Sequence, residues 1–183
     1  IPTYRFNGIL TAQITPKGSL LAGTSTIVQL DAWNWEDAAL KIDDGLHVYW
    51  PKLLKPKVDY LRQKLEFESN DKYQGSVESN LNVAAVQRIL AGEAILYLHV
   101  DNAREIIEAL NFAKDFAVPN VVLVGAREAL KVKDLILERQ VPILVQHVLG
   151  LPASEDIAID ENFSRPARFK AVGFAVGLAA QIF

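Results

Sequence analysis

The stretch Ala94-Ile95-Leu96-Tyr97-Leu98-His99-Val100 decides the fold, because it is an almost continuous apolar run. Such a run is typical of a strand that is buried on both faces of a parallel sheet. Two similar runs follow it along the chain, at residues 121–124 and 142–146. The three runs therefore predict neighbouring buried strands.

The segments between these runs carry helix signals. Asn102 offers an N-cap with Glu105 three residues later, the spacing of a capping box, and residues 128–138 read as the next helix. Hydrophobic spacing predicts an earlier helix closed by Gly92, and residues 163–171 and 173–176 predict a last helix and strand. Strands that alternate with helices over short links predict a parallel α/β sheet, either doubly wound or part of a (β/α)8 barrel.

The first third of the chain has a different, β-rich pattern. We expect strands at residues 8–15, 23–31 and 46–50, a short helix at 35–42 and a turn at Asp43-Asp44-Gly45. Residues 52–79 are polar, with helical spacing at Val58, Leu61 and Leu65. We therefore predict a single α/β unit over residues 1–183, made of a β-rich part (1–51), a helical, polar connection (52–79) and βα repeats (80–183).

The composition limits the class of protein. Half of the residues are hydrophobic, 22% are charged and the net charge is −3, which excludes disorder and argues against a nucleic-acid partner. No apolar stretch is long enough for a membrane span, and the absence of Cys excludes disulfides and thiol catalysis. The chain has no Met and opens on Ile1-Pro2, so we expect a piece of a longer protein. This composition leaves both a cytoplasmic and a bacterial periplasmic location open.

Candidate functional residues follow the predicted strands. Parallel α/β folds bind ligands at the carboxyl ends of their strands, and there the sequence has His99, Asp101, Arg127 and His147. A neutral imidazole such as His99 can bind a metal while a carboxylate such as Asp101 orients it or acts in catalysis. Arg127 and His147 are the candidates for substrate binding.

Each of these residues also has a purely structural interpretation. His99 can be a hydrogen-bonded core histidine, Asp101 can cap the following helix, and His147 can lie on an exposed loop. Gly125 before Arg127 suits a tight strand-to-helix turn, because neither glycine-rich phosphate motif is present. The three histidines form no H-x-H or H-E-x-x-H motif, so the chain alone lacks a complete metal site.

Four stretches of the chain, in this order and spacing, resemble the imidazolonepropionase-like branch of the metal-dependent amidohydrolase superfamily. They are residues 8–16 with 21–30, residues 90–93 with 96–101, residues 103–116 with 122–129, and residues 141–145 with 151–152. The resemblance implies the central portion of a (β/α)8 barrel of amidohydrolase type. It also implies a divalent metal (zinc, manganese or iron) that activates water against an amide or cyclic amide carbon.

His99 matches a metal-ligand histidine of that family, and two departures from the family pattern stand beside it. The family's H-x-H is missing, and Val124 precedes Gly125 where the family has a histidine. Since valine cannot bind a metal, a catalytically inactive barrel that serves as a binding or assembly subunit is the alternative. An unrelated open α/β domain that binds a small molecule is a third hypothesis. A cut barrel leaves unpaired strand edges, so we expect a homo-oligomer or a partner chain to cover them, with a small-molecule substrate and no membrane partner.

Overall fold

The computed structural model describes residues 5–6, 8–18, 20–51, 59, 63, 81–146, 148, 150 and 157–179, with the backbone alone at 81–83. The chain divides into two compact units, Ile1–Leu96 with Val118–Asn120, and Tyr97–Ala117 with Val121–Phe183. The expected helix around Val58, Leu61 and Leu65 lies outside the described residues, as does His147.

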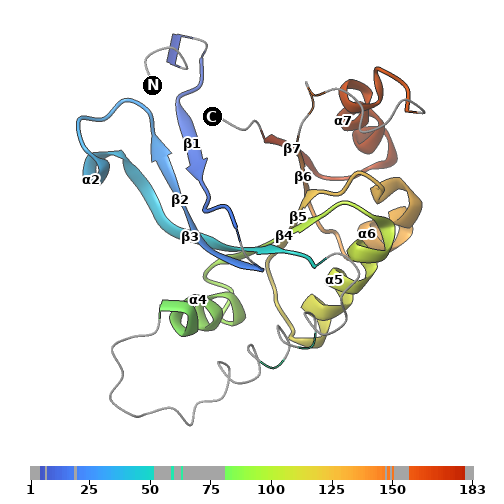
Figure 1. Ribbon diagram of the computed structural model, residues 1–183, viewed down its shortest axis with the longest axis horizontal. Helices are drawn as coiled ribbons and strands as arrows, with labels where there is room; N and C mark the ends of the chain where they lie inside the picture. The colour runs from blue at the N-terminus through green and yellow to red at the C-terminus, as the bar shows by residue number, and fades with distance from the viewer. Residues whose placement is uncertain are drawn as a thin grey trace. The chain divides into compact units, whose positions relative to one another are not determined.

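In its described part, the first unit contains an antiparallel ribbon and the helices α2 (Trp35–Ala38) and α4 (Leu81–Leu90) (Figure 1). Strand β1 runs antiparallel to β2, with Thr11 opposite Gln29, and β2 runs antiparallel to β3, with Ser25 opposite Gly45. Helix α4 packs against β3. The elements are β1 (Thr11–Ile14), β2 (Leu21–Gln29), α2 (Trp35–Ala38), β3 (Ala39–Tyr49) and α4 (Leu81–Leu90).

Two predictions for residues 35–45 are wrong, and strand pairing explains both. The helix ends at Ala38, because Ala39 and Lys41 already pair with β2. Asp43-Asp44-Gly45 is no turn but an irregular part of β3, where Asp43 has a left-handed φ of 52°. Buried Asp44 accepts hydrogen bonds from Gln13 Nε2 at 3.1 Å and Lys41 Nζ at 2.7 Å.

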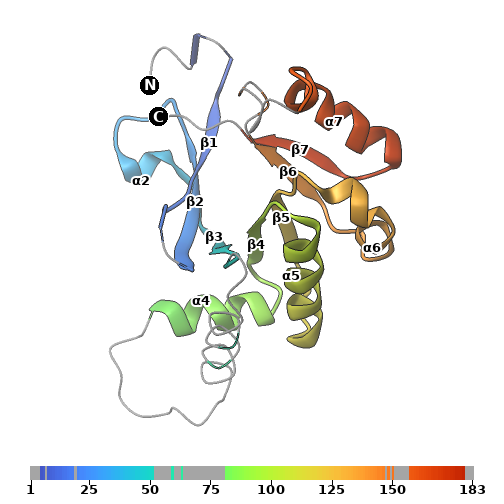
Figure 2. The ribbon, with the colours of Figure 1, turned by 45° about the vertical axis from the view of Figure 1, so that its right-hand side comes forward.

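The second unit alternates strands and helices. Its strands follow the order β4-β5-β6-β7, and the pairs β5–β6 and β6–β7 are parallel. Helices α5, α6 and α7 lie along one side of these strands in both views (Figure 1, Figure 2). The elements are β4 (Ile95–Val100, which begins in the first unit), α5 (Ala103–Asp115), β5 (Val121–Gly125), a 3-10 turn (Ala129–Val132), α6 (Lys133–Glu138), β6 (Ile143–Gln146), α7 (Glu161–Val172) and β7 (Val176–Ala179).

The sequence pattern predicted the mixed α/β architecture and the strands β4, β5 and β6 correctly. The capping box of Asn102 and Glu105 is present at the start of α5. Two details differ. The helix expected at 128–138 consists of a 3-10 turn followed by α6, and the last strand begins at Val176 because Gly173, with a left-handed φ of 100°, ends α7. That the chain is the central portion of a (β/α)8 barrel stays a prediction.

The register of the parallel strands places His99 in a row of side chains on one face of the sheet. The Ala126 N–H donates to the Val100 carbonyl at 2.6 Å, so His99 of β4 lies beside Val124 of β5. Val124 in turn lies opposite Leu144, and Leu144 opposite Gly177. The fully buried core residues of these strands, such as Leu98, Leu123 and Ile143, alternate with this row.

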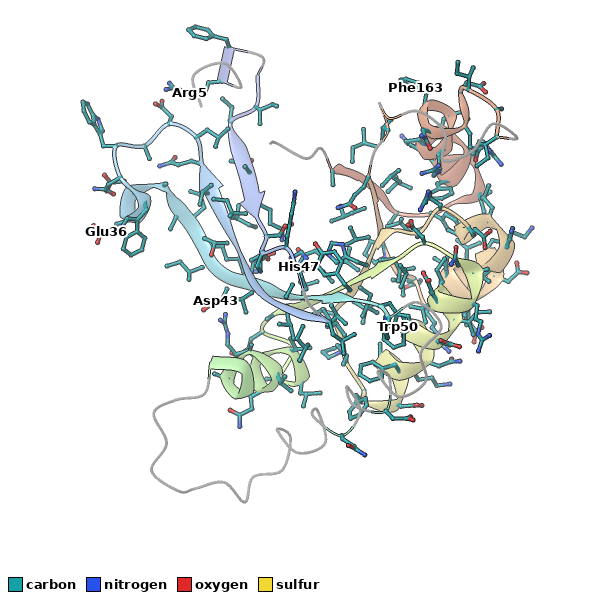
Figure 3. All side chains as sticks on the ribbon, in the orientation of Figure 1. Arg5, Glu36, Asp43, His47, Trp50 and Phe163 are labelled. Atoms are coloured by element: carbon teal, nitrogen blue, oxygen red, sulfur yellow. The ribbon has the colours of Figure 1, made fainter. Side chains whose placement is uncertain are left out.

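The three tryptophans of the chain all belong to the first unit. Trp33 and Trp35, between β2 and β3, are exposed, whereas Trp50, directly after β3, is buried. Figure 3 labels Trp50 together with His47, which is buried within β3. Among the helices in the described ranges, none has the length and apolar character that crossing a membrane requires.

Candidate functional site

The turn after β5 brings its backbone close to the end of β4. Gly125 has a φ of 88°, and a Cβ at this position would lie 3.0 Å from both Asp101 Oδ1 and the Val100 carbonyl oxygen. The next residue, Ala126, also has a left-handed φ, of 47°, and is fully buried. Glycine is therefore required at 125, and the strand-to-helix turn predicted there is confirmed.

This turn directs Arg127 toward Asp101. Arg127 Nη2 donates to Asp101 Oδ2 at 2.6 Å, and both side chains are partly exposed. The hydrogen bond to Asp101 is the main cause of a raised pKa for Arg127. Because parallel strands end at the same edge, two side chains that are 26 positions apart in the chain form one charged pair at the carboxyl edge of β4 and β5.

Two glutamates fix the start of α5 next to this pair. Glu105 Oε2 accepts the backbone N–H groups of Asp101 at 3.0 Å and Asn102 at 3.2 Å, and the side chain is buried. Glu128 Oε2 accepts the Ala103 N–H at 2.9 Å, a bond that is the main cause of a lowered pKa for Glu128. These bonds satisfy N–H groups that the first turn of a helix leaves without intrahelical partners, and they hold Asp101 in place.

The predicted site residues are partly brought together. Asp101 and Arg127 are in contact, and half-buried His99 is the fifth residue of β4, two positions before Asp101. The role of Asp101 as the cap of α5 falls to Asn102 instead. His147 lies outside the described residues, so its predicted place at the same edge stays a prediction.

The described residues do not fit a complete divalent metal centre. Within the described ranges, no three His, Cys, Asp or Glu side chains are grouped so that they could hold a metal ion. The neighbour of His99 on β5 is Val124, which has no ligand atom and is only 4% exposed. Asp101, the nearest carboxylate in sequence, accepts the Arg127 guanidinium.

The sequence patterns missed one charged residue of this unit. Arg165 in α7 is buried, although it is a guanidinium within a polar segment. Its spacing from Asn162 and Phe169, three positions before and four after, puts all three on the buried side of α7. That spacing was the available signal, but charged residues are so seldom buried that the pattern alone does not reveal it.

Comparison with known proteins gives a structural likeness. No protein-family model matches the chain, and no curated protein matches it either. A crystal structure of an amidohydrolase from Thermotoga maritima MSB8 is similar, with a TM-score of 0.73 and 18% sequence identity over 93% of this chain. The chain thus has an amidohydrolase-like fold. It covers 50% of the length of that amidohydrolase chain.

Proposed function

We propose that this chain is part of a hydrolase of amidohydrolase type that cleaves the C–N bond of an amide or cyclic amide. The Arg127–Asp101 pair at the carboxyl edge of β4 and β5 carries this proposal, because folds of this kind bind their substrates at that edge. The amidohydrolase-like fold supports the reaction class. The four stretches described above support the imidazolonepropionase-like branch as the finer assignment.

In this proposal the residues at the edge have distinct roles. Arg127 is a hydrogen-bond donor for the substrate, and Asp101 is the candidate acid or base. Asp101 is held in place because its carboxylate accepts from Arg127 and its backbone N–H donates to Glu105. His147 is a second substrate contact. His99 is a substrate contact or one ligand of a zinc, manganese or iron ion, whose other ligands would have to come from residues other than the described ones.

A second candidate function is a catalytically inactive member of this fold that serves as a binding or assembly subunit. The observation that favours it is the buried Val124 directly beside His99, where a metal centre on these two strands would need a ligand. A binding subunit would still use the charged edge, because Asp101 and Arg127 need no metal to bind a polar ligand.

Metal analysis and hydrolysis assays on the full-length protein separate the two candidates. We would express the protein with zinc, manganese or iron, measure bound metal by elemental analysis, and follow the release of amines from N-acyl amino acids and the ring opening of cyclic amides. The hydrolase proposal expects stoichiometric metal in the native protein, a loss of metal in His99→Ala, and retention of metal in the matched control His147→Ala. Metal-free protein without hydrolysis at saturating metal would overturn it in favour of the binding subunit.

A further inference from the structure

Arg165 is a buried cation without an ion-pair partner among the described residues. Its side chain in α7 is 4% exposed. Nη2 donates to Asn162 Oδ1 at 2.5 Å, but Nε, which is also buried, has no hydrogen-bond acceptor among the described residues. None of the described carboxylates forms an ion pair with it. Burying a charged group without a partner is strongly unfavourable, so this arrangement points to an anion that is not part of the described chain.

Four carboxylates of the second unit have partners other than Arg165. Each of three carboxylates in this unit has its own cation; the pairs are Asp101 with Arg127, Glu128 with Lys131, and Glu161 with Arg168. A fourth carboxylate, that of Glu105, accepts two backbone N–H groups and the side-chain amide of Asn102. Glu161 and Asp101 act electrostatically on Arg165 without forming an ion pair with it, so the buried Nε–H of its guanidinium stays an unused donor.

Arg165 belongs to the carboxyl edge of the parallel strands. Helix α7 follows β6, and Asn162 Nδ2 in its first turn donates to the Gly150 carbonyl, 2.8 Å away, in the segment that leaves β6. In Figure 2, α7 lies beside β7 and β6. Burial lowers the pKa of Arg165, and among the nearby charges Glu161 and Asp101 raise it whereas Arg127 and Arg168 lower it. Arg127 follows β5 and Arg165 lies near the start of the helix that follows β6, so the order of elements places both arginines at this edge.

We propose that Arg165, together with Arg127, binds a carboxylate group of the substrate at the carboxyl edge of β4, β5 and β6. A guanidinium presents a planar fork of donors that matches the two oxygens of a carboxylate. This inference rests on the proposed function in one respect, since it makes the substrate an acidic amide such as an N-acyl amino acid.

Binding measurements test the proposal without relying on turnover. We would determine dissociation constants by calorimetry for N-acetylglycine and for the neutral N-acetylglycinamide, using the full-length protein. Charge-assisted hydrogen bonds predict that the acid binds about tenfold to hundredfold more tightly than the amide. In Arg165→Gln this preference should disappear, whereas the matched control Arg104→Gln, an exposed arginine of α5, should keep it.

A spectroscopic measurement on the native protein guards against a misfolded variant. The Nε–H signal of Arg165 in a ¹⁵N-labelled sample should shift when N-acetylglycine is added and stay in place with the amide. Equal affinities for acid and amide, or an unmoved Nε–H signal at saturation, would overturn the proposal. Inorganic phosphate that binds more tightly than N-acetylglycine at pH 7 would also overturn the choice of a carboxylate.

The outcomes for this inference and for the proposed function are distinguishable. A preference for the acid that depends on Arg165, in a protein without hydrolytic activity, supports the carboxylate site and contradicts the hydrolase. Hydrolysis of neutral amides without any preference for acids supports the hydrolase and contradicts the carboxylate site.

Discussion

Replacing Gly125 by alanine tests the geometry of the turn on which the charged edge depends. The φ of 88° lies in the left-handed region, where an L-residue costs about 1–2 kcal/mol relative to glycine. The new Cβ would also lie 3.0 Å from Asp101 Oδ1 and from the Val100 carbonyl oxygen. Because the carbonyl oxygen is backbone, the chain must shift to make room, at a cost of about 1–3 kcal/mol. We expect Gly125→Ala to lower the free energy of unfolding by about 2–5 kcal/mol.

Gly173→Ala is the matched control for this experiment. Gly173 also has a left-handed φ, of 100°, but the nearest atom to its added Cβ is Leu137 Cδ2 at 3.8 Å, an ordinary contact distance. The control should therefore cost only the backbone strain, about 1–2 kcal/mol. Urea denaturation of the two variants and the native protein, followed by circular dichroism, gives both values. Equal losses in the two variants would refute the close approach between the β5 turn and Asp101.

Three further predictions concern the core, the pH dependence of stability and the assembly. Phe169→Ala should cost about 3–5 kcal/mol in urea denaturation, because Phe169 is fully buried and packs edge-to-face on Phe174, whereas Phe163→Ala, at an exposed position of the same helix, should cost less than about 0.5 kcal/mol. Burial lowers the pKa of His47 to about 4, although the charge of Asp44 raises it. Between pH 6.5 and 4 the imidazole is therefore protonated in the unfolded chain but neutral in the folded chain. The contribution of His47 to the free energy of unfolding should therefore be constant above pH 6.5 and decrease as the pH falls toward 4. If His47→Phe shows the same pH dependence of unfolding as the native protein, this prediction is wrong. Light scattering should find an oligomer, since β1 and β7 each have a strand neighbour on one side only in the described sheet, and a monodisperse monomer would count against it.

Local signals predicted the parallel part of the fold well. The apolar run that ends at Val100 became β4, and the Asn102–Glu105 spacing became a capping box, because both features depend on residues close in sequence. The turn predicted at Asp43–Gly45 is wrong, because this segment pairs with β2 and Asp44 accepts a hydrogen bond from Gln13, which is distant in sequence. Neighbouring residues in the sequence do not predict strand pairing of this kind.

The candidate site, too, could be predicted only where it depends on the order of the elements and not on contacts between distant residues. Asp101 and Arg127 could be proposed because both directly follow buried strands, and the rule for carboxyl ends needs only the order of elements. That they form a pair, and that Glu128 accepts the Ala103 N–H, depends on how the β5 turn bends. Arg165 could not be proposed, since its burial and its unused Nε–H depend on how α7 packs and not on residues close in sequence.

The placement of the tryptophans determines which events intrinsic fluorescence can report. Trp33, Trp35 and Trp50 all lie in the first unit, so the emission of the native protein combines two water-exposed indoles with one shielded indole. Unfolding of the first unit should redshift the signal of Trp50 alone and leave the other two almost unchanged. The second unit, which carries the charged edge, contains no tryptophan at all. A tryptophan introduced at the exposed Phe163 would give that unit an optical reporter of its own.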